Sequence, residues 1–112
     1  TRFGFDERSL RRLPSAKSAS LSIVGVKGDS MEPTLSDGDE VLVDASDHGS
    51  RLRDGIYVLR SDDSLVVKRI AIKPGGRQIT IASDNPAYPT WRDMDRSEVH
   101  VVGRVIWFGR AL

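Results

Sequence analysis

A serine and a lysine are the residues of this 112-residue sequence whose types could together perform nucleophilic chemistry. Ser30 lies in the stretch GDSMEPTLSDGDEVLVD, Gly28 to Asp44, between an acidic residue and Met31 and shortly before Pro33. An ordinary polar loop does not require a methionine or a proline at these positions. The stretch therefore predicts that Ser30 is a nucleophile, and a nucleophilic hydroxyl needs a base from elsewhere in the chain.

Lys68 is the candidate for that base. In SLVVKRIAI, residues 64–72, period-two alternation puts Lys68 on one face with Val66, Ile70 and Ile72. We expect both faces of this strand to be largely covered, and burial lowers the pKa of an amine until its neutral form can accept a proton. A lysine at a strand end that reaches water or an acidic partner is the alternative interpretation. Serine paired with neutral lysine is a recurring hydrolase site that needs no cysteine, histidine or metal.

The composition argues against several other kinds of site. The chain has no cysteine, which excludes disulfides and thiolate metal sites, and we expect no metal and no cofactor. His48 in a polar loop and His100 among valines are interpreted as structural or surface residues. With 17 basic and 16 acidic residues, the chain lacks the basic excess of a nucleic-acid-binding domain. A small basic cluster fits a solvated helix face: Arg8, Arg11, Arg12 and Lys17.

No apolar run approaches the roughly 20 residues that span a bilayer, and no charged-then-apolar leader opens the chain. We therefore expect a cytoplasmic protein without a membrane partner. The first residue is Thr1, which suggests a domain cut from a longer polypeptide.

The length suits one compact domain over residues 1–112. FDERSLRRL predicts one short helix within a helix-and-linker segment, 1–20, and the β core follows over 21–112. Strands are predicted from Leu21 onward, in EVLVD, GIYVLR, SLVVKRIAI, QITIAS and EVHVVGRVIWFG. PGGR indicates a hairpin turn, and Gly103 a bulge. These signals favour a mainly β protein with a closed or strongly coiled sheet.

Several blocks, in order from Leu21 to the C-terminus, resemble the C-terminal domain of LexA and phage repressors, a relative of signal peptidase. They are GDSMEPTLSDGDEVLVD, LRDGIYVLR, LVVKRI, ITIASDNPAYP and VVGRVIWFGRAL. The resemblance implies a mainly β fold with a coiled sheet or partly closed barrel and one short N-terminal helix.

The resemblance also implies roles for individual residues. Ser30 would attack a peptide carbonyl, Lys68 would take and return the proton, and the backbone N–H groups of Asp29 and Ser30 would stabilise the oxyanion. Met31 and Pro33 would fix the loop, with Met31 packing inward. The segment Ser83, Asp84 and Asn85 matches one that lies near the dyad in relatives; Asp84 and Asn85 are the supporting residues expected there. The alternative is a turn before Pro86.

The resemblance also implies a function. The chain would be the dimerisation domain of a LexA-like or prophage transcriptional repressor, and Ser–Lys self-cleavage would inactivate that repressor. Operator DNA would be bound only through an N-terminal helix-turn-helix domain absent from this chain, and a RecA–DNA filament is the partner that promotes cleavage in relatives. Homodimerisation is expected through the C-terminal strand, Val99 to Phe108. Alternatively, Trp107 and Phe108 close the domain's own core.

The family's scissile bond joins alanine or cysteine to glycine, and neither dipeptide occurs in this chain. Three explanations stay open: the bond precedes Thr1, it has another sequence, or the regulator does not cut itself. Two other functions also stay open. One is a signal-peptidase-type enzyme, and the other is a non-catalytic dimerisation or ligand-sensing module.

Overall fold

The computed structural model describes residues 20–47 and 52–112. Seven strands and one 3-10 turn form the described part. They are β1 (Leu21–Gly25), β2 (Glu40–Asp44), β3 (Gly55–Ser61), β4 (Ser64–Ile72), β5 (Gln78–Ala82), β6 (Trp91–Asp95), η2 (Arg96–Glu98) and β7 (His100–Gly109). The six strands expected from the sequence are present, and β6 is an addition. The helix predicted in FDERSLRRL lies outside the described residues.

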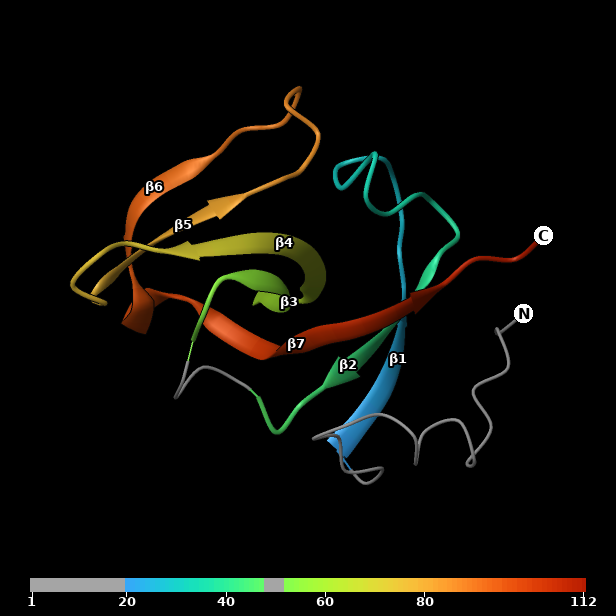
Figure 1. Ribbon diagram of the computed structural model, residues 1–112, viewed down its shortest axis with the longest axis horizontal. Coiled ribbons are helices and arrows are strands. Elements are labelled where there is room, and N and C mark those ends of the chain that lie inside the picture. Colours follow the sequence, from blue (N-terminus) through green and yellow to red (C-terminus); the bar gives the residue numbers. More distant parts are fainter. Residues whose placement is uncertain (1–19, 48–51) are drawn as a thin grey trace.

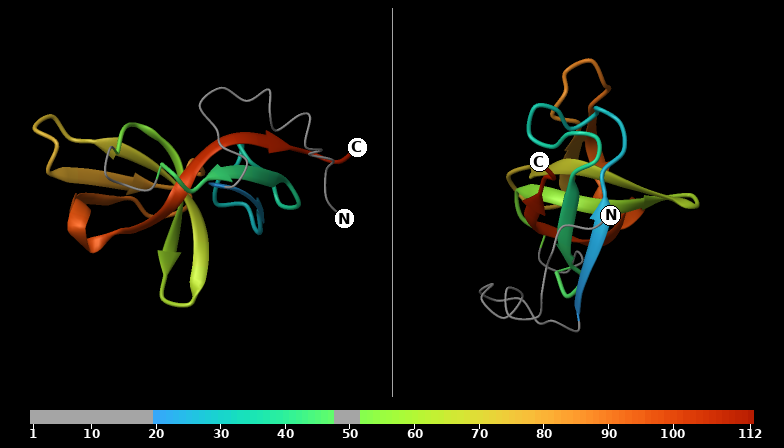
Figure 2. Two further views of the ribbon diagram at one scale, coloured as in Figure 1. Left: turned by 90° about the horizontal axis from the view of Figure 1, so that it is seen from below. Right: turned by 90° about the vertical axis from the view of Figure 1, so that its right-hand side faces the viewer.

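The strands form a single antiparallel sheet in the order β1-β2-β7-β3-β4-β5-β6 (Figure 1). β7 lies in the interior of the sheet and pairs with both β2 and β3. In the right-hand view of Figure 2, β1 and β2 run across the direction of β3 and β4. The prediction of a mainly β fold is therefore confirmed, and the sheet is strongly coiled and open rather than closed, with β1 and β6 at its two ends.

A bulge in β7 allows the sheet to bend. Val58 pairs with Gly103 while the next residue of β3, Leu59, pairs with Val101, so one residue of β7 has no opposite partner. A Cβ on Gly103 would lie 2.6 Å from a methyl group of Val43 and 2.7 Å from the carbonyl oxygen of Asp44. The bulge predicted at Gly103 is confirmed, and glycine is needed there because β2 passes so close.

Two hydrophobic clusters make up the core. The first contains Val26, Met31, Leu35, Val41, Val43 and Val58. The second contains Tyr57, Leu59, Ile70, Ile79, Ile81 and Val101. The first joins β2 and β3 to the loop that carries Ser30, and the second joins β3, β4, β5 and β7. The loop of Ser30 thus packs against the first cluster, and the strand face of Lys68 packs against the second.

The expectation that both faces of β4 are covered is wrong for one face. The face of Lys68 packs against the second cluster through Val66, Ile70 and Ile72. On the other face, Leu65, Arg69 and Ala71 are exposed, and only Val67 packs against the first cluster. On this exposed face the charged side chain of Arg69 reaches water and pairs with Asp84.

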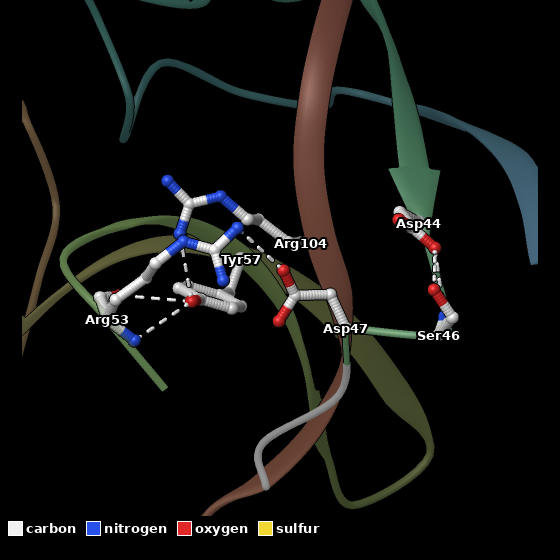
Figure 3. A network of polar contacts seen from close by, with 6 residues as sticks. All are labelled: Asp44, Ser46, Asp47, Arg53, Tyr57 and Arg104. Carbon is white, nitrogen blue, oxygen red and sulfur yellow. Dashed lines mark hydrogen bonds and ion pairs between the residues drawn. The ribbon is translucent and has the colours of Figure 1, made fainter. Parts of the chain in front are cut away.

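A polar network holds the segment before β3 to β7 (Figure 3). The buried hydroxyl of Tyr57 donates to the carbonyl of Arg53 at 3.0 Å and accepts from the Arg53 N–H at 3.3 Å and from Arg104 Nη1 at 3.0 Å. Arg53 also forms an ion pair of 2.9 Å with Asp47. These contacts satisfy a tyrosine hydroxyl that the core would otherwise leave unpaired.

Candidate functional site

Ser30 lies in the loop between β1 and β2, and the loop is anchored on both sides of it. Gly28 adopts φ +79°, which favours glycine, and its N–H donates to Asp37 Oδ1 at 2.6 Å. The Leu35 N–H donates to the carbonyl of Met31 at 2.9 Å, and Met31 is 2% exposed in the first core cluster. Met31 therefore packs inward, as expected. Pro33 is exposed and follows a cis peptide bond.

Lys68 projects from β4 on the covered face of that strand. Its Nζ donates to Ser83 Oγ at 2.7 Å, and Ser83 is buried directly after β5. The ring centroids of Tyr88 and Trp91 each lie 5.9 Å from Nζ. Burial lowers the pKa of Lys68 below its usual value because a charged amine loses hydration there. Burial thus shifts the protonation equilibrium of Lys68 toward the neutral amine that a general base requires.

Ser30 and Lys68 line one cavity of about 360 Å³. Its walls are formed by Val24 to Lys27 on one side and Ser64 to Lys68 on the other. Within the described residues, the hydrogen bond of the Lys68 amine goes to Ser83 rather than to Ser30. The structure therefore brings the predicted pair into one groove without a direct hydrogen bond between them.

Asp84 connects the lysine strand to the serine loop. Arg69 donates to its two carboxylate oxygens at 2.7 and 2.8 Å, and the Thr34 hydroxyl donates to Oδ2 at 2.5 Å. The hydrogen bond from Arg69 is the main cause that lowers the pKa of Asp84, with a further contribution from Thr34. Arg69 follows Lys68 directly on β4. The Asp84 carboxylate therefore links β4 to Thr34, in the loop that carries Ser30.

Asn85 holds the backbone around Ser30. Its N–H donates to the Ser30 carbonyl at 3.0 Å, and its side-chain amide donates to the Asp29 carbonyl at 3.0 Å. Tyr88 adds a hydrogen bond from its hydroxyl to Asp29 Oδ1. The Ala87 N–H donates to Asn85 Oδ1 at 3.0 Å, as in an Asx turn. The two interpretations of this segment therefore coexist, since Asn85 forms a turn and contacts the serine loop.

The hydroxyl of Ser83 is the contact that sequence reasoning did not single out, although Ser83 belongs to the expected segment. A signal for it was present in the hairpin around PGGR. Arg69 pairs with Ala82 across β4 and β5, so the same antiparallel register continued by one residue sets Lys68 opposite Ser83.

The described residues contain no cluster of three or more histidine, cysteine or acidic side chains that could hold a metal ion. His100 is exposed on β7, and His48 lies outside the described part of the chain. Across residues 20–47 and 52–112, no helix has the length and hydropathy needed to cross a membrane.

The family model described as Peptidase S24-like matches residues 5–106. The chain belongs to the Peptidase S24-like family. This confirms the resemblance to LexA and phage-repressor C-terminal domains. The S24-like chain is 34% identical over 89 residues to the 26 kDa repressor protein of Escherichia phage HK022, covering 78% of the chain and 37% of that relative.

The chain is also 34% identical over 106 residues to repressor protein CI of Enterobacteria phage phi80, covering 93% of the chain and 43% of the relative. It is 38% identical over 85 residues to the LexA repressor of Ruegeria sp. (strain TM1040), covering 72% and 32%. The S24-like chain thus spans less than half the length of these curated relatives.

Proposed function

We propose that this S24-like chain is the self-cleaving peptidase and dimerisation domain of a LexA-like or prophage transcriptional repressor, with Ser30 as nucleophile and Lys68 as general base. The observation that carries the proposal is the groove that Ser30 and Lys68 share, in which burial lowers the pKa of Lys68. The repressor names of the three relatives support the regulatory part.

In the first chemical step, Ser30 Oγ bonds to a peptide carbonyl carbon while the neutral Lys68 amine takes the hydroxyl proton. The backbone N–H groups of Asp29 and Ser30 would stabilise the oxyanion, and a donor of this kind is worth about 3–4 kcal/mol of the barrier. The Lys68 ammonium then protonates the leaving amine as the C–N bond breaks. A water molecule, deprotonated by Lys68, hydrolyses the acyl-enzyme and restores both residues.

The substrate in this proposal is an extended peptide segment. β4 pairs with β5 only from Arg69 to Ile72, so Ser64 to Lys68 have a strand partner on one edge only among the described residues. β1 is an end strand of the sheet, and Val24 to Lys27 face the same groove. An extended peptide placed between these edges would complete their hydrogen bonds, as in β-strand addition.

Dimerisation is proposed through the end of β7. Trp107 is 42% exposed and Phe108 is 44% exposed. Because these two side chains are so exposed, they do not close the domain's own core. Their exposure therefore supports a dimer interface over core closure. In the whole protein, an N-terminal DNA-binding domain would bind the operator as a dimer, and cleavage between the domains would weaken that binding.

A non-catalytic dimerisation or sensing module is the second candidate function. It is favoured by the hydrogen bond of Lys68 to Ser83 instead of Ser30. In that case the groove would bind a segment without cutting it, and the intact protein would remain the regulator.

Incubation of the full-length protein over a range of alkaline pH tests the proposal, with fragments followed by mass spectrometry. We expect first-order cleavage in the wild type, and no cleavage in Ser30→Ala or Lys68→Ala. Matched controls are Ser22→Ala on β1 and Lys73→Ala, whose exposed amine contacts Asp93; both should cleave like the wild type. An intact wild-type chain throughout would favour the non-catalytic module.

A further inference from the structure

The loop between β5 and β6 folds over the residues that carry the candidate nucleophile. In Figure 1 and in the right-hand view of Figure 2, it lies beside the loop between β1 and β2. The Tyr88 N–H donates to the Asn85 carbonyl at 3.1 Å, which orders the β5–β6 loop internally. From this loop, Asn85 and Tyr88 donate three hydrogen bonds to Asp29 and Ser30. The serine loop is therefore held by a segment distant in the sequence.

One of these hydrogen bonds orients the peptide unit that contains the Ser30 N–H. The Asn85 side-chain amide donates to the Asp29 carbonyl at 3.0 Å, and the Glu32 N–H donates to the same oxygen at 3.1 Å. The C=O and N–H of a planar trans peptide unit point in opposite directions, so the Ser30 N–H points away from the Asn85 amide. Among residues 20–47 and 52–112, this N–H has no acceptor. It is therefore held in one direction and can donate to an oxygen of a bound molecule.

Tyr88 connects this peptide unit to the candidate base. Its hydroxyl donates to Asp29 Oδ1, and its ring centroid lies 5.9 Å from Lys68 Nζ. A hydrogen bond to a carboxylate is roughly twice as strong as one between neutral groups. Tyr88 is 39% exposed, and Asp29 is also exposed. Because both side chains lie outside the core, packing alone does not account for their contact.

We propose that Tyr88, together with Asn85, is a positioning residue that holds the Ser30 N–H toward the oxyanion of the bound peptide. The role rests on the proposed function and adds Tyr88 to it. Removal of a whole oxyanion donor costs about 100- to 1,000-fold in rate. Tyr88 acts on the donor indirectly, through Asp29, so loss of its hydroxyl should cost less, about tenfold.

Labelling of the full-length protein with a fluorophosphonate tests this role without requiring a scissile bond. Ser30 Oγ bonds to phosphorus, fluoride leaves, and Lys68 takes the hydroxyl proton, while the phosphoryl oxygen takes the place of the oxyanion. Intact-mass spectrometry follows the rate, and Ser30→Ala identifies the labelled residue. Tyr88→Phe should label about tenfold more slowly than the wild type. Thr90→Ala, at an exposed position of the same loop, is the matched control and should label like the wild type.

The pH profile of labelling separates positioning from an effect on the base. Tyr88→Phe keeps the ring beside Lys68, so the plateau rate should fall while the midpoint of the profile stays unchanged. Asn85→Asp keeps the oxygen that accepts the Ala87 N–H but loses the amide donor, so its plateau rate should fall about 100-fold. A wild-type plateau rate in Tyr88→Phe would overturn the proposal.

Variants of Asp29 test whether the Tyr88 hydroxyl acts through this side chain. Asp29→Asn retains an acceptor oxygen and should keep most of the labelling rate. Asp29→Ala removes the acceptor, and Tyr88→Phe should then have little further effect. An equal loss from Tyr88→Phe with and without Asp29→Ala would contradict the proposed route.

These outcomes are separable from those of the proposed function. Labelling that slows in Tyr88→Phe, in a protein that does not cut itself, would reject self-cleavage and retain the positioning role. Self-cleavage and labelling that are both unaffected by Tyr88→Phe would retain the peptidase and reject the role. A wild type that neither labels nor cuts would reject both.

Discussion

Lys68 donates a 2.7 Å hydrogen bond to the buried hydroxyl of Ser83, which lies opposite it in the continued register of β4 and β5. A neutral amine has two N–H donors and one lone pair. When Ser83 accepts one N–H, the lone pair stays free for the proton of Ser30. Ser83 therefore fits the role of a positioning residue for the proposed base.

The rate of self-cleavage should rise with pH. Burial lowers the pKa of Lys68, and only the neutral amine can act as base, so the rate follows the deprotonated fraction. We expect a sigmoidal profile with its midpoint below the ordinary lysine value of about 10.4. First-order rates of the full-length protein across pH measure it. A profile that falls with rising pH, while the protein stays folded by circular dichroism, would contradict Lys68 as base.

Ser83→Ala should slow self-cleavage about 10- to 100-fold at the pH plateau, because the amine loses the group that orients it. The midpoint of the pH profile should shift downward, since a hydrogen-bond acceptor stabilises the charged amine more than the neutral one. Ser83→Thr retains a hydroxyl and should recover most of the rate, and Ser22→Ala is the control. Loss of rate without a shifted midpoint would indicate a merely structural role for Ser83.

The sequence was sufficient to predict the strands that carry the site. Alternation in SLVVKRIAI placed Lys68 on the same face as Val66 and Ile70, and the structure covers that face. Met31 was expected inside and is buried. These features follow from local patterns, since one strand face or one loop residue needs only its own neighbours to be predicted.

Other features depend on contacts that local patterns do not reveal. β6 was missed because the three charged residues of WRDMD leave no apolar alternation in the sequence. An end strand tolerates such charges. Coverage of the face of Leu65 was predicted wrongly because it depends on packing by residues distant in the sequence, and on that face only Val67 packs against the first cluster. The Lys68–Ser83 contact required a hairpin register, and the ion pair of Arg69 with Asp84 required the path of the loop after β5.

Asp84→Asn should destabilise the domain by about 1–3 kcal/mol, because the charged hydrogen bonds from Arg69 are lost. The pKa of Asp84 is lowered in the folded protein, so its stabilisation is present above the unfolded-state pKa of about 3.9 and is lost as pH falls through the folded value. Urea unfolding of both proteins at pH 7 and in acid measures this difference. A gap that stays constant into strong acid would contradict the ion pair as its cause.

Gly103→Ala should destabilise the domain by about 1–3 kcal/mol, since its methyl group would overlap the Val43 side chain and the Asp44 carbonyl. Gly25→Ala is the matched control because a Cβ there has no atom within 4 Å and Gly25 has no positive φ. Thermal unfolding of the two variants compares them directly. Equal melting temperatures would show that β2 can move away from the bulge at little cost.

The dimer proposed through the end of β7 should dissociate when charge is placed on its apolar surface. Phe108→Asp should raise the dimer dissociation constant by about 100-fold or more, because a carboxylate would be dehydrated at the interface. Leu65→Asp is the control, since Leu65 and Phe108 are each 44% exposed and Leu65 lies on β4. Sedimentation equilibrium of the chain and both variants measures the constants. If the unmodified chain is monomeric at high micromolar concentration, or if both variants weaken the dimer equally, the interface is not at Phe108.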